Sequence, residues 1–197
     1  MGRLDEALVH FQAAHSIFKD SALTEYCIAQ IFIETGRPQE ALVHFENIVN
    51  GHGMGFGHFS IFSLYVDYGF TLMMLRQFDK AVPLLEKGLA LNEDVPHGLN
   101  ALGYCFMQMA RRQEAQVAFE RGLHYDEANP WLQNNFGVAL VLNGHLEAGS
   151  QLILQAAVAD PAVAAFQHNV KFVQTLVSTN RWPAEQLVLE LFYNRGS

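Results

Sequence analysis

Apolar residues recur three and four positions apart along almost the whole chain. One such run comprises Leu84, Leu85, Leu89 and Leu91. This spacing puts side chains on one face of an α-helix, whereas a strand would alternate with a period of two. Prolines fall near the expected helix starts, where a missing N–H costs no hydrogen bond; they are Pro38, Pro96, Pro130 and Pro161. The pattern predicts an all-α chain of short helices.

The apolar runs and the residues between them give an opening helix followed by hairpins. The opening helix is expected at residues 3–17. The first helices of the hairpins are expected near 22–34, 62–75, 96–109 and 130–142, and the second helices near 38–50, 78–91, 112–125 and 146–158. Gly36, Arg76, Arg111 and Gly144 mark the short turns inside the hairpins. A final helix pair is expected near 162–178 and 183–193, with Trp182 and Pro183 at its turn.

The chain repeats itself with a period of 34 residues. The heptapeptide EALVHFQ at 6–12 returns as EALVHFE at 40–46. The same step links Gly69 to Gly103 and Gly137. Ala81, Ala115 and Gly149 form a second series at this spacing. Small residues recur where two helices must touch closely, because they admit a neighbouring helix without a side chain in the way. The sequence therefore predicts a stack of helical hairpins.

Two stretches fit a 34-residue unit with Leu-Gly and an aromatic residue on the first helix and small, aromatic and small residues on the second. They are Leu102, Gly103, Phe106, Ala115, Phe119 and Gly122, and then Gly137, Gly144, Gly149, Ala156 and Pro161. Here the chain resembles the tetratricopeptide-repeat family. The resemblance implies a right-handed α-solenoid, or superhelix, of about five helical hairpins with a C-terminal capping helix pair.

On this basis residues 1–197 form a single solenoid. Its expected parts are an orphan second helix at 1–20, repeats at 21–50, 61–95, 96–129 and 130–161, a Gly- and His-rich insertion at 51–60, and capping helices at 162–197. Lys171 stands where the repeats have Gly, which sets the last pair apart. Repeat arrays need such a modified end to close the apolar stack.

The opening helix matches the second helix of a repeat, so its apolar edge could be uncovered. That edge consists of Leu4, Leu8 and Phe11. Three explanations stay open: the chain is part of a longer array or has a separate upstream segment, a second copy covers the edge, or local packing is already tight. Truncation is favoured over self-association through this helix.

The insertion Gly51–His58 alternates glycine with other residues, which cannot continue a helix. A hinge or partner-contact loop is favoured over a neutral spacer. With His44, its His52 and His58 bring three imidazoles near each other in sequence. A metal site is disfavoured because neither Cys nor paired carboxylates complete a ligand set. We therefore expect no metal here.

Composition narrows the class of partner. The chain is 50% apolar and 16% charged, against roughly a quarter charged in an average soluble domain, which excludes disorder. Twelve Lys and Arg against twenty Asp and Glu give a net charge of −8, so nucleic acid and anionic membranes would be repelled. No apolar stretch approaches the roughly 20 residues of a membrane-spanning helix, so no membrane insertion is expected. Without a targeting signal, a cytoplasmic location is expected, with Cys27 and Cys105 reduced and buried.

In a tetratricopeptide-repeat array the first helices line a concave groove, and stepping by 34 picks out its residues. The expected groove residues are Tyr26, Gln30, Phe70, Met73, Asn100, Tyr104, Met107, Trp131, Asn134, Asn135, His168, Asn169 and Phe172. Their amides each offer a donor and an acceptor, which suits the backbone of an extended peptide. Taken singly, Asn134 and Asn135 could merely cap or solvate a helix, and Met73 and Met107 could be core. Replacing Asn100 and Asn134 by Ala is expected to weaken binding with little loss of thermal stability.

The sequence contains no catalytic constellation, and no cofactor is expected. His97 and His124 fall on different predicted helices, so Cys105 has no evident base and is not expected to be a nucleophile. The leading function is a non-catalytic scaffold that binds a peptide or helix of a neutral or basic partner protein in the groove. The alternatives are the docking or regulatory region of a longer enzyme or secretion assembly, and a chaperone for secreted subunits. Groove lysines and arginines that would clamp a C-terminal carboxylate are missing.

Overall fold

The computed structural model describes residues 2–18, 21–52, 60–182 and 187–189. Within these residues it contains α-helices and one π-helical turn, η1, and no strand, as the apolar periodicity predicts. The elements are α1 (Gly2–Ile17), α2 (Ala22–Glu34), α3 (Pro38–Asn47), η1 (Ile48–His52), α4 (Ile61–Met74), α5 (Phe78–Leu91), α6 (Pro96–Gln108), α7 (Arg112–Tyr125), α8 (Pro130–Leu142), α9 (Leu146–Ala159) and α10 (Ala164–Thr179).

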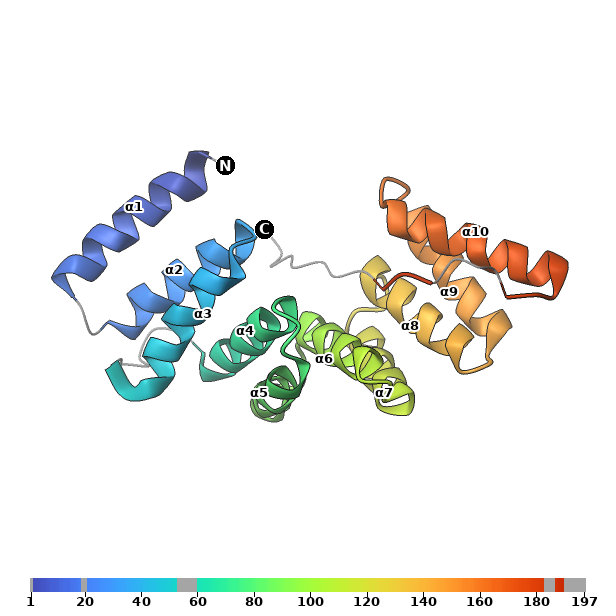
Figure 1. The fold of residues 1–197 in the computed structure, drawn as a ribbon, viewed down its shortest axis with the longest axis horizontal. Coiled ribbons are helices and arrows are strands. Elements are labelled where there is room, and N and C mark those ends of the chain that lie inside the picture. Colours follow the sequence, from blue (N-terminus) through green and yellow to red (C-terminus); the bar gives the residue numbers. More distant parts are fainter. Residues whose placement is uncertain (1, 19–20, 53–59, 183–186, 190–197) are drawn as a thin grey trace. The chain divides into compact units, whose positions relative to one another are not determined.

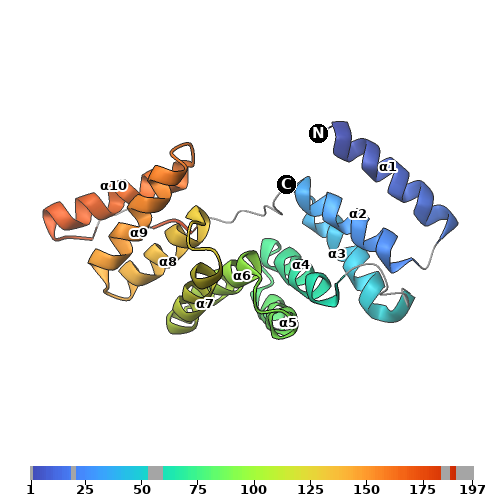
Figure 2. The ribbon, with the colours of Figure 1, turned by 180° about the vertical axis from the view of Figure 1, so that it is seen from behind.

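The helices belong to two compact units, residues 1–93 and 94–197. In the first unit α1 packs on α2, and the hairpins α2–α3 and α4–α5 follow. In the second unit the hairpins α6–α7 and α8–α9 are followed by α10, which packs on α9. Figures 1 and 2 show the two helices of each hairpin lying side by side. The predicted hairpin order is confirmed in each unit.

Helix starts carry the signals that the sequence predicts. Pro38, Pro96 and Pro130 each stand in the first turn of their helix, where the N–H would have no partner. Before α8, the Asn129 side chain accepts hydrogen bonds from the N–H groups of Trp131 and Leu132, both at 3.1 Å. These local signals fix where α3, α6 and α8 begin.

Glycines bring the two helices of a hairpin into backbone contact. A Cβ added to Gly149 would lie 2.6 Å from the carbonyl oxygen of Gly137, and a Cβ added to Gly137 would lie 2.7 Å from the carbonyl oxygen of Gly149. In the preceding hairpin a Cβ at Gly103 would lie 2.5 Å from the ring of Phe119. These approaches explain why small residues recur every 34 positions.

The turn inside each hairpin passes through one residue with a positive φ. Gly36 and Gly144 have φ of 71° and 90°, and Arg76 and Ala110 have 59°. Residues 76, 110 and 144 are 34 apart, so the turn repeats with the helices. In the third hairpin Ala110 takes this conformation, and Arg111 is instead the residue just before α7. A side chain is strained in this region, whereas glycine is not.

Ala110→Gly should therefore stabilise the protein by roughly 0.5–1 kcal/mol, because the relief of strain exceeds the extra chain entropy of glycine. Chemical denaturation measures this change. Ala90→Gly is the control, since Ala90 is exposed in the last turn of α5, where glycine should cost about 0.5–1 kcal/mol. A destabilisation of equal size at both positions would contradict the left-handed turn.

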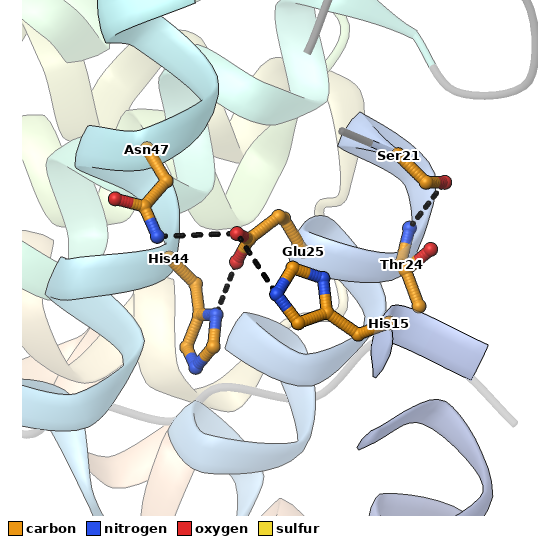
Figure 3. A network of polar contacts seen from close by, with 6 residues as sticks. All are labelled: His15, Ser21, Thr24, Glu25, His44 and Asn47. Carbon is orange, nitrogen blue, oxygen red and sulfur yellow. Dashed lines mark hydrogen bonds and ion pairs between the residues drawn. The ribbon is translucent and has the colours of Figure 1, made fainter. Parts of the chain in front are cut away.

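A buried carboxylate joins the first three helices (Figure 3). Glu25 of α2 is 6% exposed. Its side chain accepts a hydrogen bond from Asn47 Nδ2 at 3.1 Å and contacts His44 Nδ1, both on α3. His15 Nε2 of α1 lies 3.8 Å from Glu25 Oε1. Glu25 therefore connects α1 to the α2–α3 hairpin.

Packing of α1 on α2 leaves Leu4, Leu8 and Phe11 half-buried. The larger exposed apolar side chains at this end are Val9, Ile17 and Phe18. The predicted edge is thus partly covered by this chain itself. Self-association through α1 stays a prediction.

Glu25→Ala should destabilise the protein by about 1–3 kcal/mol, because half-buried His44 and Asn47 on α3 would lose their buried acceptor. Thermal unfolding followed by circular dichroism tests this. Glu86→Ala on exposed α5 surface is the matched control and should change stability by less than about 0.5 kcal/mol. Equal, negligible effects for both variants would mean that the Glu25 contacts contribute nothing.

The expected helix at 183–193 is wrong for its described part, because residues 187–189 are not helical. The other residues of that range lie outside the described chain. The C-terminal cap in the described residues is therefore α10 with a short non-helical segment, Leu187-Val188-Leu189, named here the C-terminal segment. Most of the Gly51–His58 insertion also lies outside the described residues. Gly51, inside η1, has a φ of 95°.

Candidate functional site

Four asparagines on the alternate helices α6, α8 and α10 of the second unit form a hydrogen-bonded row, named here the amide row. Asn169 of α10 donates to Asn134 Oδ1 at 2.8 Å, Asn134 of α8 donates to Asn135 Oδ1 at 3.1 Å, and Asn135 donates to Asn100 Oδ1 of α6 at 2.9 Å. All four were predicted from the sequence as groove residues. Asn100 is 4% exposed, and the other three are fully buried.

The amide row ends on the main chain of Val188. Asn169 Nδ2 donates to the Val188 carbonyl oxygen at 2.7 Å, and the Val188 N–H donates to Asn169 Oδ1 at 2.8 Å. Asn134 Nδ2 donates to the same carbonyl at 3.3 Å. A side-chain carboxamide thus pairs with the main chain of one residue as a neighbouring strand would.

The flanking leucines of the C-terminal segment contact apolar residues of the same unit. Leu187 and Leu189 are half-buried and pack against a cluster of Val138, Val141, Ile153, Phe172, Val173 and Leu176. The ring of Phe172, a predicted groove residue, also contacts the ring of Trp182, with the two ring centroids 5.8 Å apart. The site therefore combines main-chain hydrogen bonds with an aliphatic surface.

The pairing inside the row follows a simple rule. Asn100 and Asn134 occupy one position of the 34-residue repeat, and Asn135 and Asn169 occupy the next position. Each bond between hairpins joins the first position of one hairpin to the second position of the following element, a separation of 35 residues. Burial then requires that both members be polar, because an unpaired buried amide is costly.

The first unit contains a related contact. Tyr26 of α2 donates its hydroxyl proton to Asp67 Oδ2 of α4 at 2.6 Å, and Gln30 Nε2 donates to the same oxygen at 3.3 Å. Asp67 is fully buried. It occupies the same position of the 34-residue repeat as Ala101, Asn135 and Asn169. Tyr26 and Gln30 thus hold Asp67, which sequence reasoning missed as a site residue.

The remaining predicted groove residues divide by burial. Phe70 and Met73 are 4% and 1% exposed and belong to the core of the first unit. Trp131 packs on Phe166 with ring centroids 4.9 Å apart. Those left half-exposed are Gln30, Tyr104, Met107, Trp131 and His168. Among the predicted groove residues this last group is the part that stays accessible, whereas the amide row is buried.

The titratable groups give no sign of a nucleophile at Cys105. Burial raises the pKa of the Cys105 thiol to about 12, so the thiolate is scarce near neutral pH. Partial burial lowers the pKa of His97. Cys27 is half-buried, less enclosed than predicted. Across the described residues, no group of three or more His, Cys, Asp or Glu side chains is placed to hold a metal ion.

Two further features lie apart from the amide row. A hollow of about 990 Å³ runs along α9, and Leu154, Val158 and Val177 are among its lining residues. These three side chains are 43%, 82% and 63% exposed. The residues that line it include none of the predicted groove residues. Among the described residues, no helix has the length and apolar character needed to cross a membrane.

Sequence reasoning missed Val188 because residues 183–193 were expected to be helical. The only signal available was the aliphatic triplet Leu187-Val188-Leu189, and periodicity cannot distinguish a short apolar run in a helix from one in an extended segment. The four asparagines of the amide row could be predicted from the sequence, because the repeat places them at equivalent positions.

The paired helices, the 34-residue glycine spacing and the repeated turn define an all-α solenoid with the tetratricopeptide-repeat fold. Solved structures agree. YrrB, a tetratricopeptide-repeat protein with an unusual peptide-binding site, is 20% identical, and the match covers 86% of this chain and 84% of YrrB with a TM-score of 0.67.

Two further solved structures show the same likeness. PilF of Pseudomonas aeruginosa is 17% identical, with 91% of this chain and 78% of PilF covered and a TM-score of 0.72. TTC0263, a tetratricopeptide-repeat protein of Thermus thermophilus, is 16% identical, with 89% and 92% covered and a TM-score of 0.66. No family model and no curated protein matches the sequence. The likeness at these identities establishes the fold.

Because the amide row is buried, the expectation that its alanine variants keep their thermal stability no longer holds. Removing one amide leaves its buried neighbours without a hydrogen-bond partner. Asn135→Ala should destabilise the protein by about 1–3 kcal/mol, since Asn134 loses an acceptor and Asn100 loses a donor. Urea denaturation measures the change. Gln113→Ala, on the exposed face of α7, should be nearly neutral. An Asn135→Ala protein as stable as Gln113→Ala would show that the row is not formed.

Proposed function

We propose that this protein is a non-catalytic scaffold that binds an extended segment of another protein along the amide row. The observation that carries the proposal is the pairing of Asn169 with both the N–H and the carbonyl of Val188. A site that holds one stretch of main chain in this way has the chemistry to hold another.

A carboxamide suits this task because it has the same donor and acceptor groups as a peptide bond. It recognises the main chain whatever the side chain, so the row would set the position of a bound segment without selecting its sequence. The hydrogen bond from Asn169 Nδ2 to Asn134 Oδ1 keeps the Asn169 carboxamide in one orientation, and a fixed donor and acceptor lose less entropy on binding.

The partner proposed is a protein segment that is neutral or basic overall. The chain carries a net charge of −8, which would steer such a partner and repel nucleic acid. Half-exposed Tyr104, Met107 and His168 would supply further contacts. The solved structure of YrrB supports a peptide ligand in general, since that protein has a peptide-binding site on the same fold.

Main-chain recognition can be tested without changing the protein. A random linear peptide library is selected against the full chain, and the best peptide is resynthesised with each backbone nitrogen methylated in turn. One methylated position should lower the affinity about tenfold, because it removes the hydrogen bond to Asn169, worth about 1–1.5 kcal/mol. Isothermal titration calorimetry measures each affinity.

Methylation at the neighbouring positions is the control and should have a much smaller effect, because those N–H groups point away from the row in an extended segment. Failure to select any peptide, or equal tolerance of methylation at every position, would contradict the proposal.

A further inference from the structure

The C-terminal segment lies where a partner segment would have to bind. We propose that Leu187-Val188-Leu189 is an intramolecular ligand of the amide row and that an incoming segment must displace it. This inference rests on the proposed function and adds its regulation and the chemical class of the ligand.

Val188 and a partner segment cannot occupy the amide row at the same time. Asn169 uses one N–H for Asn134 and the other for the Val188 carbonyl, while its oxygen accepts from the Val188 N–H. Asn134 uses its two N–H groups for Asn135 and the Val188 carbonyl. The donors of both amides are therefore committed, so a second main chain can bind there only after Val188 leaves.

The side chains on either side of Val188 indicate the class of peptide that fits. Side chains two positions apart in an extended segment point the same way, and both Leu187 and Leu189 pack on the apolar cluster that contains Phe172. Val188 between them is held by its main chain. The ligand class is therefore an extended peptide with aliphatic residues two positions apart and little restriction on the residue between them.

The segment is placed to leave as well as to bind. Leu187, Val188 and Leu189 are each half-exposed, whereas the cluster residues under them are at most 7% exposed. Partial cover means that only part of the apolar contact must be broken on release.

The connection to α10 makes the segment an effective competitor. Residues 180–186 separate it from the end of α10 at Thr179. A ligand joined to its site by so short a stretch reaches an effective concentration of about millimolar. A segment that occupies the row about nine-tenths of the time would weaken a partner's apparent affinity about tenfold.

The test uses the full chain and a labelled peptide with the sequence of residues 185–191, EQLVLEL, followed by fluorescence anisotropy. The variant Val188→Pro removes the N–H that donates to Asn169 and keeps an extended backbone favourable. Val188→Ala keeps that N–H and is the matched control. Circular dichroism checks that each variant is folded. A second variant, Leu187→Ser with Leu189→Ser, weakens the apolar contact instead.

The peptide should bind Val188→Pro and the double serine variant about tenfold more tightly than the unchanged chain, and Val188→Ala like the unchanged chain. Equal affinity for all four proteins would overturn competition by the segment and leave the proposed function standing. If EQLVLEL binds none of them while a library-selected peptide does bind, the segment is not a ligand and this inference alone fails. If neither kind of peptide binds any variant, the proposed function fails with it.

Discussion

The rest of the second unit depends on one constraint: a carboxamide buried between first helices must be paired. Each asparagine of the amide row donates a hydrogen bond to the next, in the order Asn169, Asn134, Asn135, Asn100. The second N–H of Asn169 donates to the main-chain carbonyl of Val188. An unpaired amide at any position would cost about 1–3 kcal/mol, so each member of the row depends on its neighbours. Stability and the proposed binding chemistry therefore rest on the same four side chains.

The 34-residue repeat explains how the row arises. Glycines at 103, 137 and 149 pack the two helices of one hairpin closely together. A polar side chain on one first helix then meets its counterpart one hairpin later, as in the bonds from Asn135 to Asn100 and from Asn169 to Asn134. In the first unit the equivalent diagonal contact is the pairing of Tyr26 with Asp67. The fold thus repeats a geometry, and each hairpin fills it with a different polar pair.

Much of this could be predicted from the sequence. The helices, their hairpin order and the amide positions follow from apolar periodicity and from the step between equivalent residues. Burial of the amides could not be predicted, because it depends on how closely neighbouring hairpins pack. Neither could Val188 or Asp67, because a short aliphatic run suits a helix equally well and a lone Asp gives no sign of being buried. Ala110 shows a similar limit, since only the backbone reveals its left-handed turn.

The most direct test of the central claim, that the amide row holds the main chain of residue 188, is the hydrogen exchange rate of the Val188 amide in the full chain by NMR. A hydrogen bond to the buried Asn169 carboxamide predicts exchange at least about tenfold slower than in an unstructured peptide of the same sequence. Exchange at the unstructured rate would contradict it.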